Sequence, residues 1–566
     1  MRRLWVGVAA CVVLVLVGWA NRGALSAWAF AHTGEEEPLS QGRALIHLML
    51  GALRPPLDLR ADIPIRHTGV NPFGMNTFLQ QEVEPAKRAE QLRLIAAAGF
   101  GWIRQEFPWQ DIEIAAKNDF SDCRNTAATG GCISAWDKYD QIVAESEAND
   151  LRILVRLSSP PSWSRADGEA RGPFAPPDDL QDFADFAAAV AERYRGRITT
   201  YQIWNEPNIY PEWGNQPADP EAYSALLCAA YARLKAVDPK IVVLSAPLAP
   251  TLPLGLASPA QPAATDFNDL IYLERMYAAG AGACFDVMSV QGYGLNSAAS
   301  DERLRPLQFN TARNLLVRDL MVRHGDAAKA LWISEINWNA APPEVTTIFG
   351  RFSEAQQARY ASLAYERMQT EWPWVGNMMF WFFKRASDAE KDQAWYYFRM
   401  ADPDFTLRPV YASLRDYIAG ARFIGPGWFQ EDHWAIDWSA GWEAAQDDRY
   451  TFGGAQRATT PAATLAFDFV GSGVKLDLAS VEPSAEFRAT LDGQPLATLT
   501  ARDNTPMALA RGLSNERHHL EILAPVGVVI DGIIVERPSG PHPLILAGVI
   551  LALLVVSRAV TSSSSS

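Results

Sequence analysis

Short apolar runs alternate with longer amphipathic stretches between residues 67 and 418. Such alternation is typical of parallel strands, because each crossover between them needs a dozen or more residues and is usually a helix. Eight runs have the length and character of buried strands. They are residues 69–76, 102–105, 151–157, 199–204, 241–246, 287–291, 331–336 and 377–383. Because eight such units close a TIM barrel, the sequence predicts an α/β fold with a (β/α)8 barrel over residues 67–418.

A different periodicity follows in residues 421–538. Apolar residues recur there at every second position, as in Leu465 and Phe467, which is the pattern of strands with one buried face. Asp492 and Gly493 lie between two such runs and form a strong hairpin-turn signal. The sequence therefore predicts a second, accessory domain, an antiparallel β-sandwich of jelly-roll size.

Both ends of the chain carry uncharged apolar runs. Residues 1–20 hold one of them behind two arginines, as in an N-terminal transmembrane anchor or a signal segment, and the length of the run favours the anchor. Residues 543–560 are predicted to be a C-terminal transmembrane segment, because a core helix, the alternative, would need partners that a serine tail does not supply. The flanking arginines suit the cytoplasmic side. We therefore expect a membrane-anchored protein whose catalytic domain is extracytoplasmic.

Residues 21–66 are predicted to be a poorly ordered connector. They include the stretch 34–38, with three consecutive glutamates, and the pair Pro55-Pro56. One apolar patch within them, residues 45–53, is too short to span a bilayer. It is a candidate for a short interfacial helix.

Composition excludes some partners. The formal net charge of −15 argues against nucleic acid, because phosphate binding needs a basic face. A polysaccharide or oligosaccharide is compatible with it. The 19 tryptophans either stack on sugar rings or fill large cores. No set of cysteines and histidines has metal-ligand spacing, so neither a metal site nor a cofactor is predicted.

The cysteines suggest one disulfide. Cys123 and Cys132 flank a short polar stretch, and a bridge that closes this loop is expected outside the cytoplasm. Cys228 and Cys284 lie in apolar surroundings and are predicted to be buried free thiols.

Two predicted strands end with a glutamate. Asn205 and Glu206 follow the strand at 199–204, and Glu335 lies near the end of the strand at 331–336. Barrel active sites lie at the carboxyl ends of the strands. These strands, the fourth and the seventh, lie across the barrel mouth from each other, so their glutamates can bracket one glycosidic bond. Retaining hydrolysis needs two such carboxyl groups about 5–5.5 Å apart.

The Trp-Asn-Glu-Pro-Asn string at residues 204–208, together with Glu335, resembles the clan A glycoside hydrolases. Within that clan the chain is most similar to family 39-like enzymes, which include β-xylosidases and α-L-iduronidases. The resemblance covers residues 67–418. It implies that Glu206 is the acid/base and Glu335 the nucleophile.

The same resemblance implies roles for four more residues. Asn205 would hydrogen-bond the sugar 2-hydroxyl, and Arg104 would support the nucleophile. Tyr293 would hydrogen-bond the nucleophile, and Trp381 would be the platform under the −1 sugar. The structural alternatives are an ion-pair partner for Arg104, a wall residue for Tyr293 and barrel core for Trp381.

Other side chains are less constrained by the sequence. Many relatives carry histidine at the position of Gln291, and glutamine can donate a hydrogen bond but cannot be charged, which affects the substrate contacts. Trp338, like Trp109 and Trp163, is either a sugar platform at the end of a loop or part of the packing. Glu106 is a spare carboxylate candidate just past the second strand.

These residues predict a retaining glycoside hydrolase that acts by double displacement. Ionised Glu335 should raise the pKa of Glu206 and keep it protonated as an acid. The leading hypothesis is a β-glycosidase acting on an extracellular or cell-surface polysaccharide. The alternatives are a transglycosidase with the same two glutamates and a non-catalytic surface glycan-binding protein.

Overall fold

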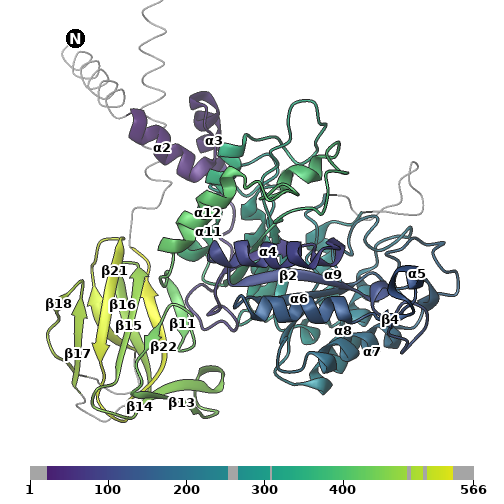
Figure 1. Cartoon of the computed structure of the whole chain (residues 1–566). Helices are drawn as coiled ribbons and strands as arrows, with labels where there is room; N and C mark the ends of the chain where they lie inside the picture. The colour runs from purple at the N-terminus through teal and green to yellow at the C-terminus, as the bar shows by residue number, and fades with distance from the viewer. Residues whose placement is uncertain are drawn as a thin grey trace, which may run out of the picture.

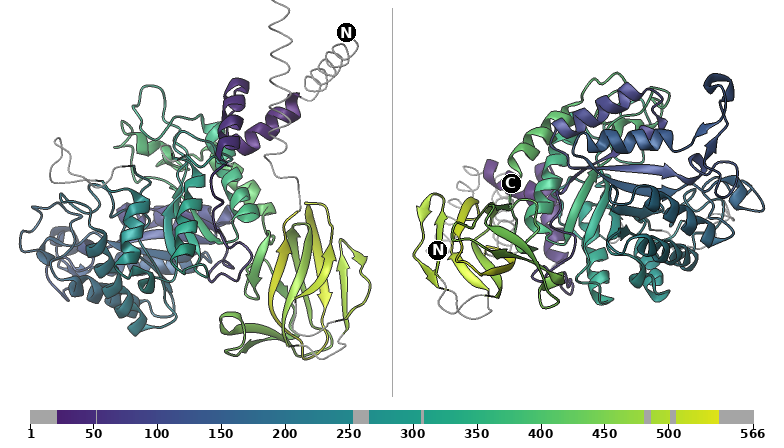
Figure 2. Two further views of the ribbon diagram at one scale, coloured as in Figure 1. Left: turned by 180° about the vertical axis from the view of Figure 1, so that it is seen from behind. Right: turned by 60° about the horizontal axis from the view of Figure 1, so that its bottom comes forward.

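The computed structural model describes residues 22–51, 53–252, 266–305, 309–480, 486–500 and 506–538. Within them the chain forms a barrel of parallel strands surrounded by helices, followed by two antiparallel sheets (Figure 1). The predicted (β/α)8 barrel and antiparallel sandwich are therefore confirmed. A second view shows the sandwich beside the barrel, with the helices around the parallel strands (Figure 2).

Eight parallel strands build the barrel, and each overlaps one of the eight predicted runs. They are β1 (Phe73–Thr77), β2 (Trp102–Pro108), β5 (Arg152–Ser158), β6 (Thr200–Ile203), β7 (Val242–Leu244), β8 (Met288–Gln291), β9 (Leu331–Ile336) and β10 (Val375–Phe380). The hydrogen-bonded order is β7-β6-β5-β2-β1-β10-β9-β8. Single parallel bridges, Leu244 to Val287 and Leu248 to Val290, bring the two edges of the sheet together. The sheet is thus a nearly closed barrel.

Helices lie between the strands and cover the outside of the sheet. They are α4 (Pro85–Ala97), α6 (Asp137–Glu147), α7 (Leu180–Arg193), α8 (Pro220–Val237), α9 (Asp269–Ala278), α10 (Asn314–Arg323), α11 (Glu354–Glu371) and α12 (Pro409–Gly420). The short α5 (Thr126–Thr129) has no buried residue and lies in the loop between Cys123 and Cys132. Local sequence sets where they begin. Asp219 caps α8 by accepting from the Ala222 amide at 2.9 Å, and Pro220 occupies the first turn. Ser353 and Gln356 form a capping box at the start of α11.

The sandwich consists of two antiparallel sheets. One contains β11 (Gly427–Gln430), β13 (Trp442–Gln446), β14 (Gly454–Ala458), β16 (Gly473–Ser480), β20 (Met507–Arg511) and β22 (Val529–Glu536). The other contains β12 (Asp437–Trp438), β15 (Thr464–Val470), β17 (Glu486–Leu491), β18 (Gln494–Pro495), β19 (Leu499–Thr500) and β21 (Arg517–Leu523). Leu465, Phe467 and Phe469 point into the core between the sheets, as their alternation predicts. Asp492 and Gly493 both have positive φ, as the predicted hairpin turn requires.

Barrel and sandwich contact each other through the chain that follows α12 and the last strand. Ile424 pairs with Phe469 of β15, and the Trp434 amide donates to the Gly69 carbonyl at 2.7 Å. Arg537, just after β22, donates to the Glu371 carbonyl at the end of α11 at 2.6 Å. These contacts place the sandwich next to α11 and α12 (Figures 1 and 2).

The predicted connector is not wholly irregular. It contains α2 (Arg22–Thr33) and α3 (Pro38–Gly51), which pack together through Ala29 and Leu45. The sequence pattern did not predict this order, because it depends on distant partners: Glu35 and Glu36 form ion pairs with arginines of the barrel. No helix among the described residues is long and apolar enough to cross a membrane. The two predicted transmembrane segments lie outside the described residues.

Two disulfides are present in the described chain. Cys123 and Cys132 are bridged as predicted, and their loop also carries the small hairpin of β3 (Ser121–Asp122) and β4 (Ile133–Ser134). Cys228 and Cys284 are bridged as well, so the prediction of free thiols is wrong. Cys228 lies on α8 and Cys284 ends a 3-10 turn that packs on this helix, with their Cα atoms 4.8 Å apart. That proximity is tertiary, and neither local sequence contains it.

Removing the Cys228–Cys284 bridge should destabilise the protein more than removing Cys123–Cys132. The first closes 56 residues and the second 9. Loop-closure entropy predicts losses of roughly 4 and roughly 2.6 kcal/mol. Urea unfolding of the two paired Cys→Ala double variants measures the difference. An equal or smaller loss at Cys228–Cys284 would contradict the expectation.

Candidate active site

The two strand-end glutamates lie at the carboxyl face of the barrel. After β6 the backbone turns sharply through Trp204 and Glu206, whose φ angles are 75° and 40°. This left-handed conformation is costly for residues other than glycine. Trp204 is held there because its indole nitrogen donates to the Glu212 carbonyl at 2.7 Å, and the Glu206 amide donates to the Pro247 carbonyl at 3.1 Å. Glu335 needs no such turn, because it is part of β9.

Both glutamates line one cavity of about 740 Å³. Its other lining residues come mainly from the ends of β2, β5, β6 and β10 and from the loops that follow them. They include Phe78, Glu106, Arg124, Lys138, Arg156, Asn205, Glu212, Trp381 and Arg385. A cavity of this size at the carboxyl ends of barrel strands is the expected place for a substrate.

Glu335 accepts hydrogen bonds from two donors. Arg104 Nη1 donates to one carboxylate oxygen at 2.7 Å, and the Tyr293 hydroxyl donates to the other at 2.8 Å. The carboxylate is nearly buried, with 6% of the side chain exposed. A buried carboxylate needs such charge-assisted hydrogen bonds to remain ionised. The predicted roles of Arg104 and Tyr293 as partners of Glu335 therefore agree with the geometry.

Arg104 also contacts three amide side chains. Its Nε donates to Gln202 at 2.7 Å, its Nη1 to Asn76 at 2.9 Å and its Nη2 to Asn205 at 2.8 Å. Asn76 lies opposite Arg104 in the register of β1 with β2. Because the Asn205 oxygen accepts from Arg104, the Asn205 amide group must point its hydrogens elsewhere.

Below this layer the barrel interior is polar. Gln202 donates to Ser289 at 2.6 Å and to Ser334 at 2.7 Å, and the two serine hydroxyls lie 2.5 Å apart. Asn76 donates to the Ser334 carbonyl at 2.9 Å. All four of these side chains are buried. The Arg104 guanidinium therefore rests on a hydrogen-bonded support that fixes its position.

Glu206 has the opposite electrostatic environment. Burial and, after it, the negative charge of Glu335 together raise its pKa to about 8. Gln291 Nε2 donates to Glu206 Oε1 at 2.6 Å, which favours the ionised form and opposes the shift. Gln291 pairs with Glu335 in the register of β8 with β9, so it lies beside both carboxylates. The site thus holds one proton-carrying and one ion-paired carboxyl group.

Sequence reasoning missed Glu212. It lies in the loop after β6 and lines the cavity, where burial raises its pKa to about 7 while nearby Arg156 lowers it. The side-chain amide of Asn205, whose oxygen accepts from Arg104, donates a hydrogen bond to the Glu212 carboxyl group. No motif or periodicity marks this position, since the loop has no regular spacing that could signal it.

The spare candidate Glu106 is engaged in an ion pair. It contacts Arg156 at 2.7 Å and accepts from the hydroxyls of Ser158 and Ser159, each at 2.8 Å. These partners lower its pKa although burial opposes them. Glu106 lines the cavity as an anion and does not replace either strand-end glutamate.

The predicted tryptophans fall into two groups. Trp381 lines the cavity at the end of β10, edge-on to Phe78. Trp338 does not line it; the side chain is fully buried, donates to the Ser297 carbonyl at 2.7 Å and packs on Tyr360. The assignment of Trp338 to substrate binding is therefore wrong. An aromatic side chain at a strand end can point into the cavity or toward the surrounding helices, and Trp338 packs against Tyr360 of α11.

Trp109 and Trp163 are packing residues as well. Trp109 is fully buried and donates to Glu113 at 2.6 Å. Trp163 lies edge-on to Trp109 and donates to the Glu113 carbonyl at 2.8 Å. Neither lines the cavity that holds the glutamates.

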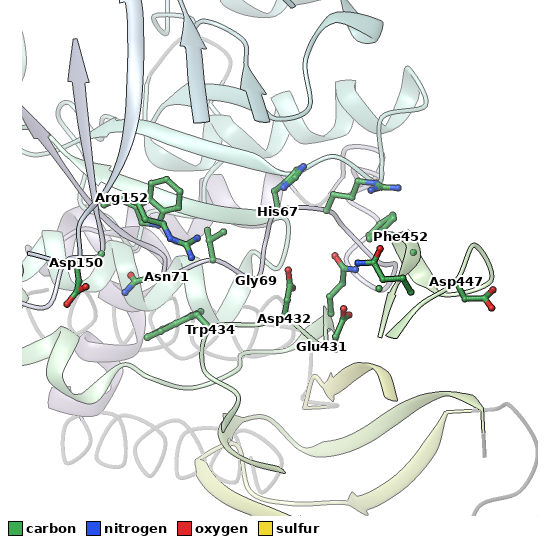
Figure 3. A pocket seen from close by; sticks show the side chains of 18 of the residues that line it. His67, Gly69, Asn71, Asp150, Arg152, Glu431, Asp432, Trp434, Asp447 and Phe452 are labelled. Carbon is green, nitrogen blue, oxygen red and sulfur yellow. The ribbon is translucent and has the colours of Figure 1, made fainter. Parts of the chain in front are cut away.

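A second cavity, of about 850 Å³, lies between the barrel and the sandwich (Figure 3). His67, Asn71 and Arg152 reach it from the amino ends of barrel strands, and Glu431 and Asp432 reach it from the segment after β11. Active sites of such barrels lie at the carboxyl ends of the strands, whereas this cavity lies at the amino ends, so we do not assign the active site to it. It contains neither strand-end glutamate.

A scan against protein-family models found no match, and a search of the curated proteins found none either. Solved structures do match. A family 39 glycoside hydrolase from Bacteroides cellulosilyticus WH2 is 17% identical, with 83% of each chain covered and a TM-score of 0.43. A family 39 β-xylosidase from Caulobacter crescentus is 14% identical over 83% of this chain and 99% of its own, with a TM-score of 0.42. A glucosidase from Croceicoccus marinus is 12% identical, with 82% and 98% covered and a TM-score of 0.44.

Substitution of Glu206 should stabilise the protein in alkaline solution. The raised pKa means that folding favours the protonated carboxyl group, so its stabilising contribution is present at low pH and is lost as pH rises through about 8. Glu206→Gln keeps the neutral form at every pH. We expect its melting temperature to exceed that of the wild type by roughly 2–4 °C at pH 9.

At pH 5 the same two proteins should melt at nearly the same temperature. Differential scanning calorimetry at both pH values measures the effect, and Glu344→Gln, at an exposed position, is the control. A lower melting temperature for Glu206→Gln at pH 9 would refute a buried, proton-carrying Glu206.

Proposed function

We propose that this protein is a membrane-anchored retaining glycoside hydrolase, with its catalytic barrel outside the cytoplasm, that cleaves an extracellular or cell-surface polysaccharide. One observation carries the reaction: two glutamates, Glu335 buried and Glu206 half-buried, share a cavity at the carboxyl face of the barrel, and their environments oppose each other. Arg104 and Tyr293 stabilise charge on Glu335, while burial and that charge keep the proton on Glu206. A nucleophile and an acid need this difference.

In the first step Glu335 attacks the anomeric carbon as the bond to the leaving oxygen breaks. Glu206 transfers its proton to that oxygen, so the alcohol departs neutral and a glycosyl ester of Glu335 remains. Arg104 keeps the attacking carboxylate oriented. Tyr293 donates a hydrogen bond to the other carboxylate oxygen, which does not attack.

The second step reverses the role of Glu206. Esterified Glu335 no longer carries a charge, so the repulsion that, after burial, raises the pKa of Glu206 most is lost. The charge of Arg104 still lowers this pKa, so the pKa of Glu206 falls. Glu206 then accepts a proton from water as the water oxygen attacks the anomeric carbon. Glu335 leaves as a carboxylate, and both groups return to their starting states.

The cavity supplies contacts for sugar. Trp381 offers an aromatic face near the nucleophile, and Asn205 lies between Arg104 and Glu212 within reach of a hydroxyl beside the anomeric carbon. The hydrogen bond from Arg104 to the Asn205 oxygen leaves the nitrogen end of this amide for the substrate. Most of the remaining lining residues are polar or charged, which suits a hydroxyl-rich substrate.

Two features support the proposed location. The two disulfides of the described chain favour an oxidising compartment. The apolar runs at residues 4–20 and 543–556, with arginines at their outer ends, favour anchoring that leaves the rest of the chain outside the cytoplasm.

Glu335→Ala should lower kcat on an aryl glycoside by roughly 10⁴-fold or more, because no other carboxylate can form the intermediate. Glu206→Ala should lower kcat by roughly 10²–10⁴-fold on substrates that need protonation. Added azide should restore part of the activity of Glu206→Ala on substrates with good leaving groups, and should yield the glycosyl azide. Steady-state kinetics and product analysis measure both effects.

The control is Glu344→Ala, at an exposed position, and thermal melts establish that each variant is folded. Wild-type rates in both glutamate variants would overturn the proposal. The same assay with an added acceptor sugar distinguishes water from sugar as the group that resolves the intermediate, because a transglycosidase would give the longer product.

The kcat/KM of the wild type should fall as pH rises above about 8, because Glu206 then loses the proton that the leaving oxygen requires. Gln291→Leu removes the donor that favours ionised Glu206, so its pKa should rise and the alkaline limb should move to higher pH. pH–rate profiles of the two proteins measure the shift. An alkaline limb that moves to lower pH in Gln291→Leu would contradict the assignment of Glu206 as the acid.

A further inference from the structure

Helix α3 presents an apolar stripe to solvent. Among the exposed large apolar side chains of the described chain, four lie in or just after this helix. They are Leu39, Ile46, Leu50 and Leu53, which are 69%, 46%, 57% and 82% exposed. The first three recur at i, i+7 and i+11, so they share one face of the helix. The other eight such side chains are scattered along the chain, and single exposed side chains of this kind are ordinary.

The opposite face of α3 is packed against α2. Ala44 and Leu45 are buried, and Gln41 donates to the Ser26 carbonyl at 3.0 Å and to the Glu35 carbonyl at 2.8 Å. The two helices therefore form one hairpin whose exposed stripe cannot rotate inward without breaking these bonds. The stripe is a fixed feature of the surface.

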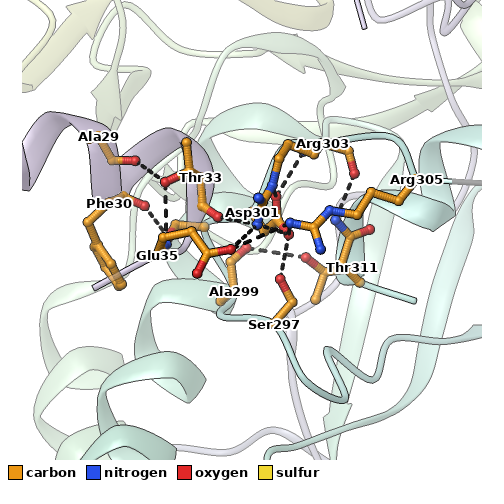
Figure 4. Close-up of polar contacts among 12 residues, drawn as sticks. Ala29, Phe30, Thr33, Glu35, Ser297, Ala299, Asp301, Arg303, Arg305 and Thr311 are labelled. Carbon is orange, nitrogen blue, oxygen red and sulfur yellow. Dashed lines mark hydrogen bonds and ion pairs between the residues drawn. The ribbon is translucent and has the colours of Figure 1, made fainter. Parts of the chain in front are cut away.

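The hairpin is tied to the barrel by charge (Figure 4). Arg303, in the chain between β8 and α10, donates to the Thr33 carbonyl at 2.9 Å and contacts Glu35 at 2.7 Å. The same guanidinium is paired with buried Asp301 at 2.7 Å. On α11 the Tyr360 hydroxyl donates to Glu36 at 2.7 Å. These contacts come from two barrel elements, so the hairpin has one orientation relative to the barrel.

Cations flank the stripe, and α3 contains no acidic residue. Arg43 is exposed one turn after Leu39, and Arg54 follows Leu53. Arg54 donates to the Leu304 carbonyl at 2.9 Å, which holds its charge beside the stripe. In a chain with a formal net charge of −15, two arginines thus lie beside the one concentrated apolar stripe among the described residues, while the exposed Glu36 and Glu37 precede its first residue. An apolar face bordered by arginines is the pattern of a helix that lies in the headgroup region of a bilayer.

We propose that α3 binds the surface of an acidic bilayer through this stripe, with Leu39, Ile46, Leu50 and Leu53 in the acyl boundary and Arg43 and Arg54 on lipid phosphates. The uncharged run at residues 4–20 ends just before α2, which begins at Arg22, so a lipid surface would be close to the hairpin. A second copy of the chain fits the face less well, because it would bring the same arginines together. The inference deepens the proposed membrane anchoring and does not depend on hydrolysis.

The contact would also orient the active site. Arg303 belongs to the same β8–α10 connection as Tyr293, which contacts Glu335. A bilayer under α3 would therefore lie beside the rim formed by this connection.

The test uses the full chain reconstituted in vesicles of phosphatidylcholine with phosphatidylglycerol. Leu50→Cys, in a Cys11→Ser background, carries an environment-sensitive fluorophore, since the other four cysteines are bridged. Brominated lipids report contact with acyl chains. We expect a blue-shifted emission and quenching that is roughly threefold stronger than for the same label at Val526→Cys, an exposed position in the turn between β21 and β22.

Charge is tested separately. Arg43→Glu should reduce the quenching at position 50, and omitting phosphatidylglycerol should have the same effect on the wild-type helix. Equal quenching at positions 50 and 526 in every vesicle would overturn the proposal. A blue shift in detergent that grows with protein concentration, without bromine quenching, would also overturn it by showing that a second copy covers the face. Glycosidase activity, measured in detergent, reports failure of the proposed function independently.

Discussion

The guanidinium of Arg104 connects residues from three other barrel strands to its own. Its donors reach Glu335 on β9, Asn76 on β1, Gln202 on β6 and Asn205 just beyond β6. A buried cation with this many directed hydrogen bonds fixes the acceptors as firmly as they fix it. The orientation of the Glu335 carboxylate and of the Asn205 amide both follow from this one group. Replacing Arg104 by lysine would keep the positive charge but would lose the planar guanidinium that donates these four hydrogen bonds.

The proposed chemistry depends on a difference between the environments of two glutamates. Glu206 and Glu335 line the same cavity, yet Glu335 is beside Arg104 and Glu206 is beside Gln291, which cannot carry charge. Burial alone would favour a proton on each of them. Arg104 pairs with Glu335 at 2.7 Å, and the charge of Glu335 raises the pKa of its neighbour Glu206. Glu212 adds a third carboxyl group with a raised pKa, and its bond to Asn205 extends the coupling away from the reacting atoms.

Sequence reasoning succeeded where the signal is local or periodic. The eight strand runs and the alternation of Leu465 with Phe467 follow from burial on one or two faces, and Asp492-Gly493 follows from the φ angles of a tight turn. It failed where partners are distant. Cys228 and Cys284 each look like an isolated buried thiol, Trp338 looks like any aromatic at a strand end, and the helices α2 and α3 owe their order to arginines more than 250 residues away.

The sequence by itself determined the barrel, the sandwich and the two strand-end glutamates, because periodicity and strand order place a side chain on a face without knowledge of its neighbours. Only the tertiary structure decided that the pKa of Glu206 is raised, which aromatic side chain lines the cavity and which way α3 faces. Those properties depend on burial and on charges from other elements, such as Arg104 beside Glu335 and Arg303 beside Glu35. Coulombic and desolvation effects act through space, so they appear only when the chain is folded.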